Sequence, residues 1–205
     1  YQTVQAVKDV SCDLSAGTLY ALVGKSGSGK TTLLSLLAGL DTPQSGDIMV
    51  NGQSLREIDV DIYRRKQASV IYQSYNLFPL MTVCENVMYP LKLLRHSDAD
   101  AKKEAQIALE KVGLGESYWK RLPAMLSGGE QQRVAIARTL AVHAQIVLAD
   151  EPTGNLDTEN SSQIIQLLSK LAHEETCCVV VVTHDLEVAK AADVVFICKG
   201  NACAN

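Results

Sequence analysis

The segment 24–31, with the sequence GKSGSGKT, constrains this chain more than any other feature. It fits G-x-x-x-x-G-K-[ST] at every position, and its glycines allow successive backbone N–H groups to face phosphate oxygens without an intervening side chain. The apolar run 19–23 predicts a strand before it, and the leucine-rich segment 31–38 predicts a helix after it. The positive end of that helix dipole adds to an anion site. A flexible Gly/Ser turn is the alternative interpretation, but it does not explain the position between a strand and a helix.

In a phosphate-binding loop of this kind, hereafter the P-loop, two side chains have defined tasks. Lys30 reaches the β- and γ-phosphates of a nucleotide, and the Thr31 hydroxyl binds Mg²⁺.

A second motif ends in two carboxylates. The run 146–149 is apolar, as expected of a strand buried on both faces, and Asp150 and Glu151 follow it directly. Open α/β sheets bind their ligands at the carboxyl ends of strands. Asp150 would there orient Mg²⁺ through its water shell, and Glu151 would polarise an attacking water. An ordinary strand with a polar end explains this motif taken alone, but together the two motifs indicate a P-loop NTPase.

Apolar runs of strand length alternate with helical patterns, so we expect an α/β domain around a largely parallel sheet. The further strand candidates are 47–50, which ends in the hairpin signal Asn51-Gly52, then 69–72, 177–182 and 194–198. No strand is expected from about Thr82 to Ala141, where Ser97-x-x-Asp100 opens a helix. We therefore interpret 74–141 as a helical lobe inserted between strands.

Composition excludes several classes of protein. The chain has 205 residues, 47% of them apolar and 20% charged, which is ordinary for a globular protein. Its net charge of -4 argues against general binding of nucleic acid. The apolar run 177–182 is far shorter than the ~20 residues that span a bilayer, and no charged-then-apolar leader opens the sequence. We expect this chain not to cross a membrane by itself.

The third motif, 126–132 (LSGGEQQ), precedes a helical pattern. Ser127 and Glu130 form a capping box, which is a common helix start. The box does not explain Gly128 and Gly129, because a glycine costs a helix about 1 kcal/mol. Both glycines are explained if a phosphate must approach the exposed N–H groups closely. The chain then holds two phosphate-binding helix starts, and one triphosphate cannot need both from one chain if they face apart.

With these three motifs the sequence resembles the ATP-binding cassette (ABC) ATPase family over nearly its whole length. The signature segment, 126–130, is similar to the family's signature motif and lies in the expected order. The resemblance implies a P-loop NTPase fold with a RecA-like core (about 1–73 and 142–200), an N-terminal antiparallel β part and a helical subdomain (about 74–141). It also implies that two cassettes pair head to tail, so that the signature of one closes on the ATP of the other.

Other positions take roles from the same resemblance. Gln73 is similar to the Q-loop glutamine, which touches Mg²⁺ and the attacking water, although a surface glutamine after a strand is common. Asp157, in Asn155-Leu156-Asp157, resembles the D-loop aspartate that crosses the dimer interface, and it also reads as a helix N-cap. His184 resembles the switch histidine that contacts the γ-phosphate. Tyr1 stands where the family has an aromatic residue that stacks on adenine, but a terminal tyrosine is equally compatible with disorder.

The implied site is complete, so we expect hydrolysis. The catalytic residues are Glu151, His184, Gln73 and Lys30. The residues that bind ATP within one chain are Tyr1, Gly24, Ser26, Gly27, Ser28, Gly29, Lys30, Thr31 and Thr32. Those that bind it from the paired cassette are Ser127, Gly128, Gly129 and Asp157. The residues that bind Mg²⁺ are Thr31, Gln73 and, through water, Asp150.

The segments 148–157 and 39–43 look like those of the macrolide-exporter and lipoprotein-release group. This resemblance implies export or extraction of a lipoprotein, an antimicrobial peptide or a drug. The chain would work at the cytoplasmic face of the membrane, as a peripheral subunit of separate transmembrane permease subunits. Their coupling helices would enter a groove lined by 75–82, and packing inside the lobe is the alternative role for that segment.

Three other functions are alternatives to that of a transporter subunit. An ABC ATPase of DNA repair or chromosome structure needs long coiled-coil arms, and the stretch between Lys30 and Ser127 has no room for them. A translation factor with two fused cassettes conflicts with one P-loop and one signature segment. A force-transmitting regulator of the cell-division type, which carries no substrate, stays open.

Overall fold

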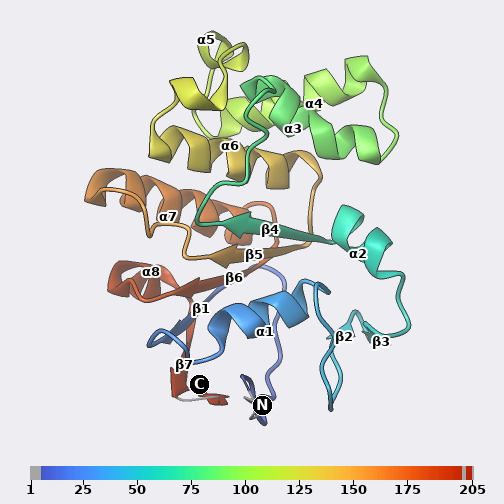
Figure 1. Cartoon of the computed structure of the whole chain (residues 1–205), viewed down its shortest axis with the longest axis vertical. Helices are drawn as coiled ribbons and strands as arrows, with labels where there is room; N and C mark the ends of the chain where they lie inside the picture. Colours follow the sequence, from blue (N-terminus) through green and yellow to red (C-terminus); the bar gives the residue numbers. More distant parts are fainter. Residues whose placement is uncertain (1–5, 200–201, 205) are drawn as a thin grey trace.

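The computed structural model describes residues 6–199 and 202–204. In this part of the chain a six-stranded sheet has the order β4-β5-β6-β1-β7-β8 (Figure 1). All neighbouring strands are parallel except the last pair. The strands are β1 (Thr18–Gly24), β4 (Ala68–Tyr72), β5 (Ile146–Asp150), β6 (Cys178–Thr183), β7 (Val194–Lys199) and β8 (Ala202–Ala204). The predicted α/β fold with a largely parallel sheet is confirmed.

The antiparallel β part of the fold is a small hairpin. It joins β2 (Met49–Val50) to β3 (Gln53–Ser54) in a separate two-stranded sheet. Asn51 and Gly52 both have positive φ, 51° and 81°, as the tight turn between two twisted strands requires.

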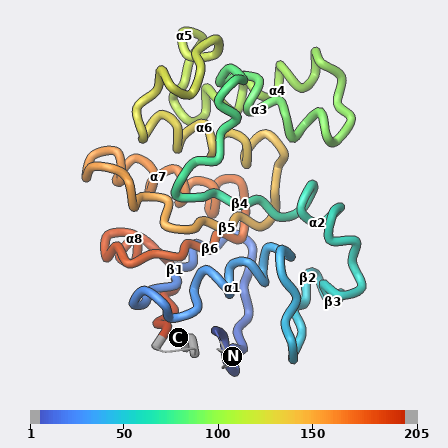
Figure 2. Tube along the Cα trace, viewed as in Figure 1, coloured from blue at the N-terminus to red at the C-terminus, as the bar shows by residue number. Residues whose placement is uncertain are grey.

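The helices account for most of the remaining described chain. They are α1 (Lys30–Leu37), α2 (Val60–Lys66), α3 (Val83–Leu93), α4 (Asp98–Lys111), α5 (Glu116–Trp119), a 3₁₀ turn at Pro123–Met125, α6 (Gly128–Ala141), α7 (Thr158–His173) and α8 (Leu186–Ala191). Among them, α3 to α6 gather beyond strand β4, at the top of Figure 1, and the tube in Figure 2 shows the same grouping. As expected, no strand occurs between Thr82 and Ala141. None of the helices in the described residues has the length and apolar character to span a bilayer.

The two faces of the sheet carry different helices. Strand β1 directs Leu19 into the core shared with α3, α4, α6 and α7, and it directs Tyr20 and Leu22 into the core shared with α1. The alternation follows from the period of two along a strand. Helices α1 and α6 therefore pack on opposite faces of the sheet.

The helical lobe shares its core with the sheet. One cluster of buried side chains joins Val83 and Ala105 of the lobe to Ile71 of β4 and Val147 of β5. A movement of the lobe is therefore transmitted to these strands through direct apolar contacts.

Asp193, just before β7, fixes the start of the central strand β1. Its Oδ2 accepts from Leu19 N at 2.7 Å and lies 2.9 Å from His173 Nε2 at the end of α7. Asp193 N in turn donates to Leu19 O at 2.9 Å. The hydrogen bond from Leu19 N, with the nearby His173, lowers the pKa of Asp193. The strand that leads to the P-loop is thus held at its beginning by a carboxylate.

This arrangement predicts a pH-dependent stability. A carboxylate whose pKa is lower in the folded than in the unfolded chain stabilises the fold at pH values above its unfolded pKa, about 3.9. This contribution is lost as the pH falls through the folded pKa. We expect Asp193→Asn, which keeps an acceptor oxygen, to unfold at lower urea concentration than the wild type at neutral pH. The difference should shrink below about pH 4. Equal differences at neutral and acidic pH would show that the charge of Asp193 does not stabilise the fold.

Candidate functional site

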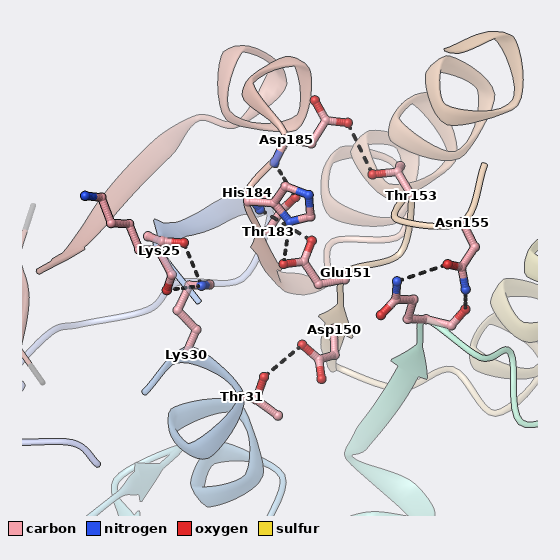
Figure 3. Close-up of polar contacts among 12 residues, drawn as sticks. Lys25, Lys30, Thr31, Asp150, Glu151, Thr153, Asn155, Thr183, His184 and Asp185 are labelled. Carbon is pink, nitrogen blue, oxygen red and sulfur yellow. Dashed lines mark hydrogen bonds and ion pairs between the residues drawn. The ribbon is translucent and has the colours of Figure 1, made fainter. Parts of the chain in front are cut away.

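Neighbouring strands bring the predicted site residues to one edge of the sheet. The register pairs Tyr72 with Asp150 and Asp150 with Val182, so β4, β5 and β6 end almost level. Strand β1 lies beside β6 in the same direction and ends at Gly24. The segments that follow these four strands therefore converge, and Figure 3 shows Lys30, Thr31, Asp150, Glu151 and His184 around one space.

The P-loop turns directly from β1 into α1. Gly29 is the N-cap of α1, with a φ of 84° and no side-chain cap. A Cβ atom there would overlap the carbonyl oxygen of Ala6, and its conformation favours glycine. Gly24, Ser26 and Gly27 lie before this start and Thr32 lies in the first turn of α1. The first N–H groups of α1 are thus free of a side-chain cap, as an anion site requires.

Lys30 bends back over its own loop. Its side chain is buried, and Nζ donates to Gly24 O at 2.7 Å and to Lys25 O at 3.1 Å. A buried ammonium needs such partners. Ser28 Oγ, also buried, has no hydrogen-bond partner among the described residues. A buried positive charge and an unpartnered hydroxyl in one glycine-rich loop fit a phosphate group.

Thr31 and Asp150 form the second part of the site. Thr31 Oγ1 donates to Asp150 Oδ1 at 3.3 Å across the gap between α1 and β5. Burial raises the pKa of Asp150 and Glu151 adds to the rise, while the hydrogen bond from Thr31 and the charge of Lys30 oppose it. A bound cation would favour the ionised carboxylate.

The oxygen donors of Thr31 and Asp150 fit magnesium. Mg²⁺ prefers hydroxyl and carboxylate oxygens, and it is commonly held by one or two protein groups together with substrate phosphates. Within the described chain no cluster of three His, Cys, Asp or Glu side chains could hold a metal ion without such help.

Glu151 and His184 form a pair on the neighbouring strand ends. Glu151 Oε1 lies 2.9 Å from His184 Nδ1, and Glu151 Oε2 accepts from His184 N at 3.4 Å. Glu151 itself has a φ of 47°, an uncommon conformation for a non-glycine residue. Its side chain is 20% exposed, whereas that of His184 is 72% exposed. The histidine therefore orients a carboxylate that is mostly shielded from solvent.

Gln73 is joined to the loop after β5. Its Nε2 donates to Asn155 Oδ1 at 3.1 Å, and Asn155 Nδ2 donates to Gln73 O at 3.3 Å. A Cβ atom on Gly154 would lie 2.7 Å from Gln73 Nε2, so the two loops are in close contact. Sequence reasoning placed Gln73 at the site but missed this amide pair, for which the sequence carries no local signal.

Asp157 caps helix α7, as predicted. It accepts from Asn160 N and from Asn160 Nδ2, both at 2.8 Å. These hydrogen bonds, first of all the one from the backbone, lower the pKa of Asp157.

The signature segment forms the predicted capping box at the start of α6. Glu130 N donates to Ser127 Oγ at 3.3 Å, and Ser127 N donates to Glu130 Oε2 at 2.7 Å. Both glycines also have neighbours in their own chain. A Cβ atom on Gly128 would lie 2.7 Å from the hydroxyl of Tyr75, and one on Gly129 would overlap the side chain of Asn160.

The structure does not bring this segment to the P-loop of the same chain. The signature segment starts α6, which packs on the face of the sheet opposite α1. Its glycines lie against Tyr75 and Asn160. Sequence reasoning missed these contacts, because they join residues far apart in the chain. Tyr1 lies outside the described residues.

An open cleft of about 960 Å³ adjoins Glu151 and His184. It continues between the starts of α7 and α8, where it is lined by Ser161 and Leu186. This cleft leaves the Glu151–His184 side of the sheet edge open.

The proteins to which this chain is similar belong to one family. The family model described as ABC transporter matches residues 7–154. The lipoprotein-releasing system ATP-binding protein LolD of Hydrogenovibrio crunogenus is 44% identical over 190 residues, which cover 91% of this chain and 82% of LolD. The ABC transporter ATP-binding protein YclH of Bacillus subtilis is 40% identical over 187 residues, or 91% of this chain and 83% of YclH.

Solved structures show the same similarity. The dimeric structure of MJ0796, a bacterial ABC transporter cassette, has a TM-score of 0.87 and 37% identity, covering 98% of this chain and 89% of that one. A dimeric post-hydrolysis state of MJ0796 bound to ADP and Pi matches with the same values. CbiO1 from Clostridium perfringens, part of the transporter complex cbiONQ, has a TM-score of 0.88 at 26% identity, covering 98% of this chain and 80% of its own.

The packing at Gly129 gives a testable result. Glycine to alanine inside a helix ordinarily stabilises by about 0.5–1 kcal/mol. At Gly129 we expect the opposite, because the new methyl group must displace Asn160 and its hydrogen bonds to Asp157, and overpacking costs about 1–3 kcal/mol. Urea denaturation of Gly129→Ala measures this loss, and adding Asn160→Ala should reduce it. A variant as stable as the wild type would contradict the close packing of α6 against α7.

Proposed function

This chain belongs to the ABC transporter ATPases, and from that premise we propose that it powers the movement of a substrate through separate membrane subunits. Its family makes it an ATP-binding subunit with ATPase activity.

One observation carries the assignment of the catalytic residues: the Glu151–His184 pair lies on the same sheet edge as Lys30 and the Thr31–Asp150 pair. We assign Glu151 as the base that accepts a proton from the attacking water, with His184 orienting its carboxylate. The water oxygen bonds to the γ-phosphorus, the bond to the bridging oxygen breaks, and ADP leaves with that electron pair.

The other side chains of the edge bind and orient. Lys30 exchanges the carbonyls of Gly24 and Lys25 for phosphate oxygens, and the unpartnered Ser28 hydroxyl gains an acceptor. Thr31, Asp150 and Gln73 are assigned to hold Mg²⁺, which when bound supplies charge neutralisation on the phosphates. Tyr1 is proposed to stack on adenine.

The opposite placement of α1 and α6 supports action between two chains. Because Ser127, Gly128 and Gly129 start a helix on the other face of the sheet from the P-loop helix, we assign them to the nucleotide of a paired cassette. Asp157 is assigned to the same interface. MJ0796, a similar cassette, has been solved as a dimer, which supports this arrangement. In such a pair of this chain, the helical subdomain (about 74–141) of one copy would close against the core (about 1–73 and 142–200) of the other.

A projecting loop supports docking to membrane subunits. Leu80 is 91% exposed, and the loop that carries it is held by the fully buried Asn86. Asn86 Nδ2 donates to the carbonyls of Phe78, Met81 and Thr82, while Asn86 Oδ1 accepts from Phe78 N. An apolar side chain presented on a loop so firmly held suits contact with an apolar partner. We assign this loop to the coupling helices of a transmembrane permease, at the cytoplasmic face of the membrane.

The substrate class follows from resemblance. The similarity to a lipoprotein-releasing ATPase favours extraction or export of a lipoprotein. The resemblance of 148–157 and 39–43 to the macrolide-exporter and lipoprotein-release group leaves an antimicrobial peptide or a drug as further candidates. A force-transmitting regulator without a carried substrate is the alternative. The two are distinguished by reconstituting the complex in vesicles, where only a transporter changes the location of a labelled lipoprotein when ATP is added.

Glu151→Gln tests the catalytic assignment. We expect phosphate release to fall at least about 100-fold, because a general base contributes 10²–10⁴-fold, while ATP affinity stays within a few-fold. Glu110→Gln, an exposed glutamate on α4, is the matched control and should behave as the wild type. Phosphate release by Glu151→Gln at the wild-type rate would exclude Glu151 as the base.

Leu80→Asp tests the docking loop. We expect the variant to lose most of its co-purification with the membrane subunits, because a charge replaces the exposed apolar contact. Ile107→Asp, which changes another exposed apolar side chain of the lobe, should retain it. Equal recovery of the membrane subunits with both variants would place the docking surface elsewhere.

A further inference from the structure

The turn after β4 has an unusual backbone. Tyr75 and Asn76 follow each other with φ values of 62° and 47°. Asn76 N donates to Ser74 O at 2.7 Å, which closes a three-residue turn around Tyr75. Two successive non-glycine residues in the left-handed region are uncommon, and such a conformation persists only where the surroundings hold it.

Arg138 of α6 holds this turn. One guanidinium nitrogen, NH2, donates to Tyr75 O at 2.8 Å, and the other, NH1, donates to Asn76 O at 2.6 Å. The planar fork of a guanidinium can serve two adjacent carbonyls at once, which a lysine ammonium does less well. Burial lowers the pKa of Arg138, so placing its charge here is unfavourable without these acceptors.

The carbonyls themselves do not need the arginine. Asn76 is exposed and Tyr75 is half-buried. Water could therefore donate hydrogen bonds to both carbonyl oxygens if the turn were free. A partly buried guanidinium is instead used to fix a turn at the surface. The arginine therefore determines where the turn lies.

The turn connects two parts of the proposed catalytic machinery. Gln73, directly before it, reaches Asn155 in the loop after β5. Tyr75, within it, extends its hydroxyl to the start of α6, where a Cβ atom on Gly128 would lie 2.7 Å away. Helix α6 thus contacts the turn from both of the helix's own ends. Gly128 at its start lies against the Tyr75 side chain, and Arg138 near its end binds the carbonyls of the turn.

We propose that Arg138 is a positioning residue for ATP hydrolysis, which ties the 74–76 turn to α6 and so holds Gln73 at the nucleotide edge of the sheet. The inference rests on the proposed function of Gln73 as a group that contacts Mg²⁺ and the attacking water.

The test compares two arginines of the same helix. Arg138→Lys keeps the positive charge but loses the planar guanidinium that serves two carbonyls. Arg138→Met removes both and places no charged group at this position. The matched controls are Arg133→Lys and Arg133→Met, because among the described residues Arg133 donates to Gln163 of α7, at 3.0 Å, and not to the turn. Three quantities are measured: hydrogen exchange of a peptide covering the turn without nucleotide, the Mg²⁺ concentration for half-maximal ATPase activity, and binding of a fluorescent ATP analogue in EDTA.

For both Arg138 variants we expect faster exchange in the turn and an increase of about 10-fold or more in the half-saturating Mg²⁺ concentration, as for loss of a group that orients a metal ligand. ATP binding in EDTA should be unchanged, because it depends on the P-loop. The Arg133 variants should match the wild type in all three measurements.

Unchanged exchange and unchanged Mg²⁺ dependence in Arg138 variants would overturn the proposal. Failure of both variants to fold would also overturn it, because Arg138 would then be required for the fold and not for the position of Gln73. The assignment of the catalytic base is checked separately by Glu151→Gln, whose loss of hydrolysis does not depend on the outcome for the Arg138 variants.

Discussion

The level ends of four parallel strands are the feature on which the rest of this structure depends. Strands β4, β5, β6 and β1 lie side by side in register, so the residues that follow them are brought to one edge without further folding. Strand β6 lies within this sheet and is buried along its whole length. The P-loop, Glu151, His184 and Gln73 owe their proximity to this alignment.

The charges at this edge have hydrogen-bond partners inside the chain. Lys30 is hydrogen-bonded to the carbonyls of its own loop, Asp150 to Thr31, and Glu151 to His184. Each of these groups is a side chain that could exchange its present partner for a phosphate, a metal ion or a water. The low cost of such an exchange is consistent with electrostatic stabilisation by preorganised groups, on which phosphoryl transfer depends.

Local sequence signals predicted much of the fold. Six strands, the Asn51-Gly52 hairpin signal and the caps at Ser97, Ser127 and Asp157 each follow from a few neighbouring residues, and the structure contains them. The short strands β3 and β8 were not predicted. The order of the strands in the sheet has no such signal, and neither have the contacts between distant loops.

The glycines of the signature segment show the limit most clearly. The sequence indicated a phosphate as the reason for Gly128 and Gly129, whereas the structure adds Tyr75 and Asn160 as close neighbours in the same chain. The contacts of Arg138 were equally hidden from the sequence. Its acceptors are the backbone carbonyls of two residues more than sixty positions away, and the identity of those residues does not indicate an arginine partner. The two explanations of the glycines are compatible, since a helix start can pack on one side and bind an anion at its tip.

Whether two cassettes complete each other's site is decided most directly by the mass of Glu151→Gln protein in solution. Size-exclusion chromatography with light scattering, with and without ATP and Mg²⁺, measures it. We expect a monomer without nucleotide and a dimer with it, and we expect the added substitution Ser127→Arg to keep the protein monomeric while it still binds ATP. A protein that binds ATP and Mg²⁺ yet stays monomeric at high concentration would contradict the assignment of the signature segment to a paired cassette.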